Sequence, residues 1–283
     1  MQKEPATRPD AIAFSIWNRK PCPTRYEQHL SEGLPSLRDV FNCVQYEAHY
    51  LFGQMTSVLA FDLGDTLVEY AGLPLSWEAH YPNALAHLAS VVEVRPTPRM
   101  MASAFSILRR YNTRLAPRVT EVSFSQILRE LLVCWEVSAA SNDSVCAEAF
   151  FAVFRQRLRC FPEVGSVLRA ARSRGQRIGV FTDVPYGMPR ELVLEDVAAV
   201  GVREWVDVLM TSCDAGHRKP SPATLETVAA AFHCDPEQML YVGNERKDIE
   251  AALAFGCEAV LLNRVGARPD WGQHRTISTL TEL

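Results

Sequence analysis

Four short apolar runs, each followed by polar side chains, constrain the fold of this 283-residue chain more than any other feature. The runs are residues 58–61 before Asp62, 176–181 before Thr182, 206–210 ahead of Lys219, and 239–242 ahead of Asn244. Runs of this length are typical of buried strands, and open α/β sheets hold their ligands at the carboxyl ends of parallel strands. In isolation Asp62 would be an ordinary turn residue, but the four runs together favour a shared polar site.

Helical segments alternate with these runs. Helices are expected at residues 162–174, 190–200, 221–232 and 248–255, and a fifth strand at residues 259–262. Strands that alternate with helices form right-handed crossovers, which place helices on both faces of a parallel sheet. The sequence therefore predicts an α/β core with a parallel sheet.

The segment between the first two runs has a different pattern. Apolar residues recur at three- and four-residue spacing in residues 77–92, 98–115, 124–135 and 145–158, which predicts four helices. Residues 1–54 contain five prolines and little periodicity before a possible helix at residues 36–52. We expect them to form an N-terminal extension of low order.

The four runs and their polar ends resemble the haloacid dehalogenase superfamily, in its subfamily with a helical cap inserted between the first and second motifs. The resemblance covers residues 57 to 265. It implies a Rossmann-like core of residues 55–70 and 161–283 with an α-helical cap of residues 71–160. A cap over the strand ends excludes water and selects the substrate.

The resemblance also implies roles for three catalytic residues. Asp62 would be the nucleophile that forms an aspartyl-phosphate, which water then hydrolyses. Thr182 would hydrogen-bond a phosphoryl oxygen, and Lys219 would neutralise phosphoryl charge and orient Asp62. Taken singly, Thr182 would be read as a capping residue and Lys219 as a solvated surface lysine.

A magnesium ion is the implied cofactor, because a phosphomonoester dianion repels a carboxylate nucleophile unless positive charge lies between them. Mg²⁺ prefers hard oxygen ligands. The resemblance assigns these to Asp62, the backbone carbonyl of Gly64, Asn244 and Asp248, although Asp248 alone would be read as a helix N-terminal charge.

Two positions depart from the family's phosphatase pattern. Gly64 stands where most family phosphatases carry an aspartate that protonates the leaving oxygen. The adjacent Asp65 is expected to accept backbone hydrogen bonds, and it could replace the lost acid only if the turn is distorted. Asn244 stands where an aspartate is usual, so the metal site loses one negative charge and should bind Mg²⁺ more weakly.

Several side chains of the predicted cap are further candidates for the site. Two of the four arginines Arg109, Arg110, Arg114 and Arg118 are candidates to meet an anionic substrate, although a solvated helix face is the favoured interpretation for any one of them. Acids that the cap could supply are His80, Tyr81 and His87.

These observations lead to one function and two alternatives. The leading interpretation is a Mg²⁺-dependent phosphatase of a small phosphorylated metabolite. The alternatives are a hydrolase with another leaving group, such as halide, and a catalytically weak binding or regulatory protein on the same scaffold. A net charge of −4 gives no reason to expect nucleic acid, and the absence of a bilayer-length apolar run argues against a membrane protein. Eight cysteines without a C-x-x-C pair and no apolar leader favour the cytoplasm. The sequence leaves the substrate and the oligomeric state open.

Overall fold

The computed structural model describes residues 56–138, 142–266 and 269–283. The predicted N-terminal extension, with its possible helix at residues 36–52, lies outside the described residues. No helix in the described ranges is both long enough and apolar enough to cross a membrane.

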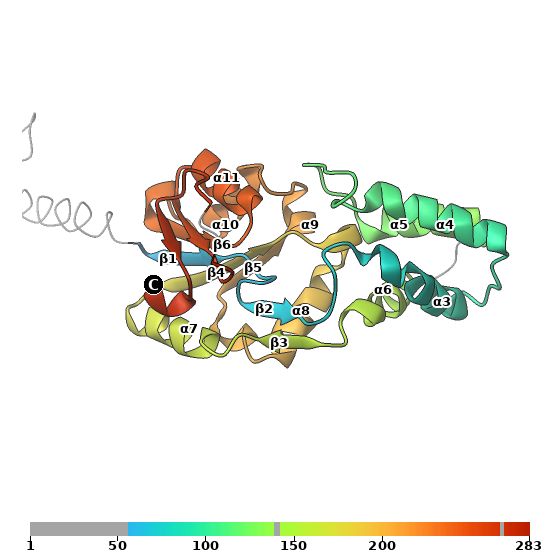
Figure 1. Ribbon diagram of the computed structural model, residues 1–283, viewed down its shortest axis with the longest axis horizontal. Helices are drawn as coiled ribbons and strands as arrows, with labels where there is room; N and C mark the ends of the chain where they lie inside the picture. Colours follow the sequence, from blue (N-terminus) through green and yellow to red (C-terminus); the bar gives the residue numbers. More distant parts are fainter. Residues whose placement is uncertain (1–55, 139–141, 267–268) are drawn as a thin grey trace, which may run out of the picture. The chain divides into compact units, whose positions relative to one another are not determined.

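A six-stranded parallel sheet forms the core of the described chain, as Figure 1 shows. Its strands are β1 (Val58–Phe61), β4 (Arg177–Thr182), β5 (Val208–Thr211), β6 (Met239–Gly243), β7 (Glu258–Leu262) and β8 (Arg275–Ile277). They lie in the order β5-β4-β1-β6-β7-β8, and every pair is parallel. The predicted fold class is therefore confirmed, and the first-motif strand lies at the centre of the sheet between β4 and β6.

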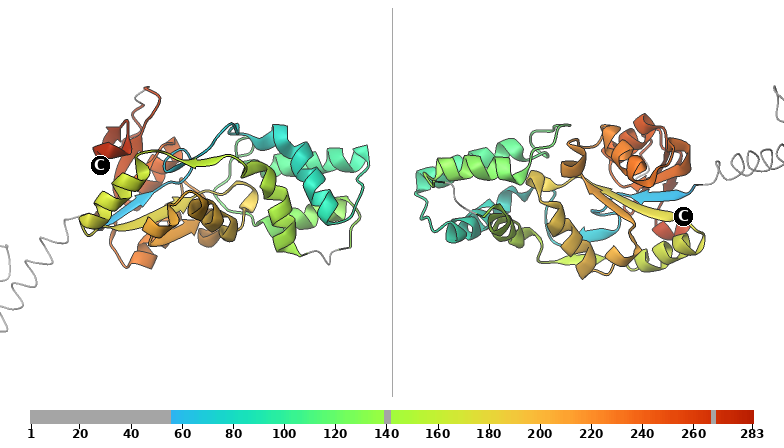
Figure 2. Two further views of the ribbon diagram at one scale, coloured as in Figure 1. Left: turned by 90° about the horizontal axis from the view of Figure 1, so that it is seen from below. Right: turned by 180° about the vertical axis from the view of Figure 1, so that it is seen from behind.

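Helices cover both faces of this sheet. Because side chains alternate along a strand, successive residues of β1 pack against the helices on opposite faces. Val58 and Ala60 of β1 belong to one buried cluster, which α10 (Ala223–Phe232) and α11 (Arg246–Phe255) complete. Leu59 and Phe61 belong to the other, together with α7 (Val164–Ser173) and α8 (Arg190–Ala199). Figure 2 shows the two layers from further directions.

Between β2 (Val68–Tyr70) and β3 (Leu158–Cys160) lies a helical insertion, residues 71–157. It contains η1 (Trp77–His80), α3 (Tyr81–Val91), α4 (Pro98–Tyr111), α5 (Phe124–Cys134), α6 (Asp143–Phe151) and η2 (Ala152–Phe154). β2 and β3 pair antiparallel, so the chain leaves and re-enters the core through one two-stranded ribbon. The four α-helices lie together in Figures 1 and 2.

Two predicted helices of the insertion are shorter than expected. The one predicted at residues 98–115 ends at Tyr111, because Asn112 is extended and its side chain accepts a hydrogen bond from the Arg114 N–H instead. The one predicted at residues 145–158 gives α6, which ends at Phe151, and a short 3₁₀ turn, because residues 158–160 pair with β2.

Short elements complete the core. They are η3 (Pro185–Gly187), η4 (Arg203–Trp205), α9 (Ser212–Ala215), η5 (Pro236–Gln238) and η6 (Leu280–Glu282). η3 and α9 each lie between a strand and the following helix, η4 and η5 each lie between a helix and the following strand, and η6 follows β8.

Candidate active site

Asp62 and Lys219 form a buried ion pair at the end of β1. The Asp62 N–H donates to the Val242 carbonyl at 2.8 Å, so the ladder with β6 continues into this residue and fixes its backbone. Lys219 Nζ lies 2.6 Å from Asp62 Oδ1, 2.6 Å from Asp248 Oδ1 and 3.1 Å from the Tyr241 hydroxyl. The ammonium group donates hydrogen bonds to Asp62 and to the Tyr241 hydroxyl and pairs with Asp248 by charge. Groups from the end of β1, from β6 and from α11 thus meet at one lysine.

The charges of this group depend on each other. Burial alone would lower the pKa of Lys219, but the carboxylates of Asp248 and Asp62 raise it well above its ordinary value. Burial, together with the nearby charge of Asp248, raises the pKa of Asp62 to about 7 although Lys219 opposes the rise. Lys219 is therefore a permanent cation, and Asp62 is a carboxylate whose charge depends on a close positive partner.

Asp248 is fixed from two sides. Its Oδ2 accepts the N–H groups of Asn244 at 3.0 Å and Glu245 at 2.8 Å, which caps the start of α11. Its Oδ1 faces Lys219. A Cβ at Gly243 would lie 2.3 Å from the Asp248 Cβ, so only glycine allows this approach. Asp248 thus pairs with Lys219 by charge, but its buried Oδ1 accepts no hydrogen bond from the described residues.

A separate set of oxygens faces away from Lys219. Thr66 Oγ1 lies 3.4 Å from Asp62 Oδ2 and 3.4 Å from Asn244 Oδ1, so these two oxygens converge on one side of the nucleophile. No group of three or more His, Cys, Asp or Glu side chains is arranged to hold a metal anywhere in the described ranges. The available donors are therefore one carboxylate oxygen, one amide oxygen and backbone carbonyls, which suit a hard cation with modest affinity.

A cavity of about 190 Å³ opens next to the turn that follows Asp62. Leu63 and Gly64 of that turn line it, whereas Asp62 and Lys219 lie behind its lining residues. Thr182, the last residue of β4, and Gly64 both line it, together with Asp183 and Lys247. Asp183 Oδ1 accepts the Lys219 N–H at 3.1 Å, and its Oδ2 lies 3.1 Å from Lys247 Nζ. The structure thus brings Asp62, Thr182 and Lys219 together, and it adds Asp183 and Lys247, whose sequence positions carry no distinctive pattern.

The turn after β1 has an unusual conformation. Asp65 has a φ of 57°, whereas Gly64 is not in the left-handed region and a Cβ there would meet no atom within 4 Å. The Asp65 side chain lines the cavity and is exposed there. Partial burial of the carboxyl group and the nearby negative charge of Glu245 raise the pKa of Asp65. The expectation that this carboxylate accepts backbone hydrogen bonds was wrong, because it forms none within the described residues. The distortion required for Asp65 to face the site is present.

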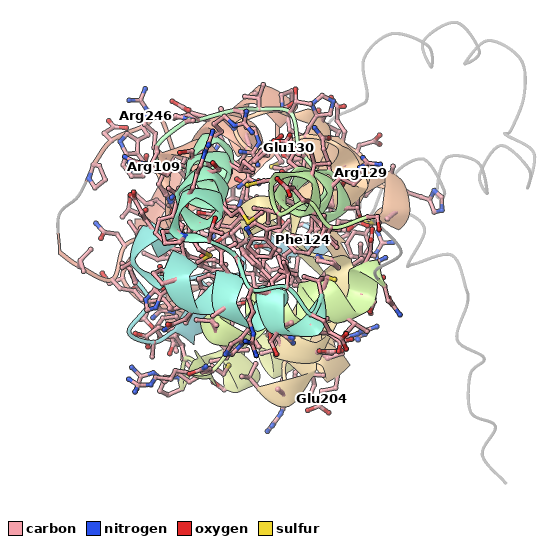
Figure 3. All side chains as sticks on the ribbon, turned by 90° about the vertical axis from the view of Figure 1, so that its right-hand side faces the viewer. Arg109, Phe124, Arg129, Glu130, Glu204 and Arg246 are labelled. Atoms are coloured by element: carbon pink, nitrogen blue, oxygen red, sulfur yellow. The ribbon has the colours of Figure 1, made fainter. Side chains whose placement is uncertain are left out.

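Of the four arginines proposed from the insertion, Arg114 lines the cavity and the other three do not. Arg114 binds Glu245 through two nitrogens at 3.1 and 2.5 Å. Arg109 pairs with Glu78 and Arg110 with Glu130, both largely exposed, and Arg118 is held by Glu121 and the Tyr111 carbonyl. Figure 3 shows Arg109 toward the outside of the insertion and Phe124 among its packed helices.

The three side chains proposed as acids from the insertion are placed elsewhere. Tyr81 is buried and its hydroxyl contacts that of Tyr186 at 2.5 Å, while His80 and His87 line a different depression. None of the three lines the cavity beside Asp62. Helical spacing locates a residue on a face of its helix but does not say which face meets the core.

A second buried ion pair joins the insertion to the loop of Lys219. Glu121 contacts Arg218, and the side chains of both are nearly inaccessible. The Glu121 N–H donates to the Gly216 carbonyl at 3.0 Å, and the Arg218 N–H donates to the Val119 carbonyl at 2.7 Å. The insertion is therefore fixed to the residue that precedes Lys219, a contact with no signal in the sequence.

Comparisons with solved structures show the fold. A 2-haloacid dehalogenase from Pseudomonas syringae has a TM-score of 0.56 with 23% identity, covering 81% of this chain and 96% of that one. A phosphatase from Thermococcus onnurineus has a TM-score of 0.55 with 18% identity, covering 80% and 95%. At these identities the likeness concerns the fold and not the reaction.

Sequence comparisons identify the family. Phosphoglycolate phosphatases from Escherichia coli and Salmonella typhi are 34% identical over 100 residues, which is 35% of this chain and 38% of theirs. The match thus spans well under half the length of these curated relatives. A family model described as haloacid dehalogenase-like hydrolase matches residues 56–256, most of the chain. The chain therefore belongs to the haloacid dehalogenase-like hydrolases.

Proposed function

We propose that this protein is a Mg²⁺-dependent phosphatase of a small phosphorylated metabolite, with Asp62 as the nucleophile. The observation that carries the proposal is the Asp62–Lys219 pair at the end of β1, with a cavity lined by the next two residues, Leu63 and Gly64. One carboxylate oxygen of Asp62 contacts the Lys219 ammonium group, and the other contacts, among the described residues, only the Thr66 hydroxyl. Such a carboxylate is oriented for attack on an electrophile bound in the cavity.

In the proposed reaction, one carboxylate oxygen of Asp62 attacks phosphorus and the bond from phosphorus to the leaving oxygen breaks. The product is an aspartyl-phosphate, and water then attacks its phosphorus and releases inorganic phosphate with Asp62 restored. Lys219 is 2.6 Å from the nucleophile and is placed to neutralise the charge that accumulates on the phosphoryl oxygens. Thr182 lines the cavity and is placed to donate a hydrogen bond to one of them.

The donor set fits a magnesium ion of modest affinity. Asp62 Oδ2 and Asn244 Oδ1 converge beside Thr66, and the carbonyl of Gly64 belongs to the same turn. Asp248 adds a further candidate donor, because its buried Oδ1 pairs with Lys219 by charge but accepts no hydrogen bond from the described residues. When bound, Mg²⁺ would supply the positive charge that lets a carboxylate approach a phosphate dianion.

We further propose that residues 71–160 act as a cap on a core of residues 55–70 and 161–283. In support, the cavity beside Asp62 is lined from the insertion as well as from the core, for example by Trp77 and Arg114. A lining of this kind excludes water from the phosphoryl group and gives the insertion control of specificity. A cytoplasmic location stays a prediction.

Turnover of a panel of phosphorylated metabolites with and without Mg²⁺ tests the proposal, with Asp62→Asn protein as the control. Hydrolysis that requires both Mg²⁺ and Asp62 supports it. Halide release from haloacids without phosphatase activity would favour the hydrolase with another leaving group. Binding of phosphorylated ligands without turnover would favour the weak binding protein, an alternative that Gly64 and Asn244 together suggest.

A further inference from the structure

The part of the cavity remote from Asp62 is aromatic and aliphatic. We call it the organic end, defined by Leu73, Leu75, Trp77, Tyr186, Met188 and Val193. Trp77 is held rigidly because its ring stacks on Phe154 with centroids 3.9 Å apart and planes 12° apart. Its centroid is 6.0 Å from that of Tyr186, so two fixed rings form adjoining parts of the wall.

Hydroxyl groups near this wall are already occupied. The Tyr186 hydroxyl contacts that of Tyr81, the Tyr70 hydroxyl donates to Asp196 at 2.9 Å, and the Tyr111 hydroxyl donates to Glu130. A substrate hydroxyl or carboxylate would have to break one of these bonds to be recognised. The tyrosines therefore present rings rather than polar groups to a ligand.

The cations around the cavity are likewise neutralised. Both terminal nitrogens of Arg114 contact Glu245, Lys247 contacts Asp183 and Glu245, and the buried Arg218 contacts Glu121. A phosphoryl group at Asp62 would have Mg²⁺ beside it in the proposed function, although Lys219 is itself paired with two carboxylates. A second anionic group would have no metal beside it and would find only paired cations. The organic part of the substrate should therefore be uncharged.

The turn at Gly64 restricts the leaving group independently of the wall. Gly64 has no side chain to protonate a departing alkoxide, and general acid help of that kind is worth roughly 10²–10⁴ in rate. The neighbouring Asp65 lines the cavity and is the side chain of this turn that could replace the acid, a role that Asp65→Asn tests. A phenolate leaves without protonation far more readily than an alkoxide. The volume of about 190 Å³ also suffices for one ring, since a cavity of about 150 Å³ accepts benzene.

We propose that the substrate is the phosphate monoester of an aromatic alcohol, with its ring against Trp77 and Tyr186 and its phosphoryl group at Asp62. This inference rests on the proposed phosphatase function. In the step it adds, the bond between phosphorus and the aryl oxygen breaks, and the oxygen leaves with the electron pair as a phenolate that takes its proton from water.

Four phosphate compounds, each tested on the unmodified full-length protein with Mg²⁺, separate the requirement for an apolar ring from the requirement for a good leaving group. Phenyl phosphate has an apolar ring and a good leaving group, whereas cyclohexyl phosphate has a ring of similar size but a poor leaving group. Acetyl phosphate is small and has a good leaving group. Phosphoglycolate is small, carries a second negative charge and has a poor leaving group. The expected kcat/KM is highest for phenyl phosphate, and it exceeds that for cyclohexyl phosphate by about 10²-fold. Equal values for these two, or a preference for phosphoglycolate, would overturn the inference and leave the phosphatase function intact.

Variants of Trp77 test the wall itself. Trp77→Ala should raise KM for phenyl phosphate by about threefold to tenfold and leave KM for acetyl phosphate unchanged, since an aromatic pair contributes about 0.5–1.5 kcal/mol. Trp77→Phe should restore most of the loss. Trp205→Ala is the matched control, because this half-buried tryptophan packs near Arg169 and does not line the cavity. An equal change in KM for both substrates would contradict a ring-binding role.

If none of the four compounds is hydrolysed, the proposed phosphatase function fails, and binding then decides the inference separately. Calorimetry with phenylphosphonate and phosphonoacetate compares an aromatic with a carboxylate ligand that carries the same phosphonate. Tighter binding of phenylphosphonate, lost in Trp77→Ala, supports an aromatic site. Tighter binding of phosphonoacetate overturns it.

Discussion

Charged side chains at the Asp62 end of the cavity hold one another in place, whereas the organic end is built from rings and aliphatic groups. Lys219 pairs with Asp62 and Asp248 and donates to the Tyr241 hydroxyl. The organic end is apolar instead, and its Trp77 is fixed by stacking on Phe154. The difference separates two proposed tasks: the core supplies a charged centre, and residues of the insertion and the core together supply the wall beside which the organic group of a substrate would lie.

The largest effect is expected at the charged end. Asp62→Asn keeps the size and the hydrogen bond from Lys219 but removes the nucleophile, so turnover should fall by about 10⁴-fold or more. Steady-state kinetics and thermal unfolding of the purified variant measure activity and folding together. Mg²⁺-dependent activity within tenfold of the unmodified protein would show that another group attacks phosphorus.

Removing the cation should damage both activity and stability. Lys219→Met leaves the buried Asp62 and Asp248 without their common partner, which should destabilise the fold by about 3–5 kcal/mol near neutral pH. Tyr241→Phe removes one acceptor of Lys219 and the hydrogen bond to the Phe181 carbonyl, and should cost about 1–2 kcal/mol. Urea unfolding measures both. Similar losses in the two variants would mean that the carboxylates do not depend on Lys219.

Gly64→Asp sharpens the contrast between the two ends, because it adds an acid without touching the wall. A Cβ at this position meets no atom within 4 Å, so the variant should fold normally. Activity on cyclohexyl phosphate should rise by up to about 10²-fold while that on phenyl phosphate changes little. The paired variant Asp65→Asn tests whether the exposed neighbour already supplies the proton; a selective loss on cyclohexyl phosphate there would reveal that it does.

The smallest expected effect concerns the metal. Asn244→Asp adds a negative oxygen next to Asp62 Oδ2, so the Mg²⁺ concentration for half-maximal activity should fall. We expect a decrease of about tenfold, because mutating a residue that only orients a metal ligand already changes metal affinity by about that factor. Mg²⁺ titrations of activity measure it, with Asn244→Ser as a control that adds no charge. An unchanged requirement in Asn244→Asp would place this side chain outside the metal's reach.

The charged end could be predicted from the sequence because parallel strands deliver their ends to one edge of the sheet. Asp62, Thr182 and Lys219 meet there as expected. The order of the strands, the edge strand β8 and the β2–β3 ribbon were not predicted, since strands of three residues give too short a pattern. The role of Tyr241 carries one faint signal, a hydroxyl within an otherwise apolar strand.

The organic end could not be predicted because its residues come from distant segments with no shared motif. Trp77 and Tyr186 meet only after the insertion packs on the core, and the Glu121–Arg218 contact depends on the same packing. Helical periodicity likewise did not distinguish Arg114, which faces the cavity, from Arg109, which does not. These positions are fixed by tertiary contacts rather than by local pattern.

The covalent intermediate is the most direct test of the account. The protein is mixed with phenyl phosphate and Mg²⁺, quenched during turnover and reduced with borohydride, which converts an aspartyl-phosphate into homoserine. Mass spectrometry of the peptide that contains residues 58–67 should then show homoserine at position 62, and only when substrate was present. Homoserine at another aspartate, or turnover with none at position 62 under conditions that trap acyl phosphates, would contradict the assignment of Asp62 as the nucleophile.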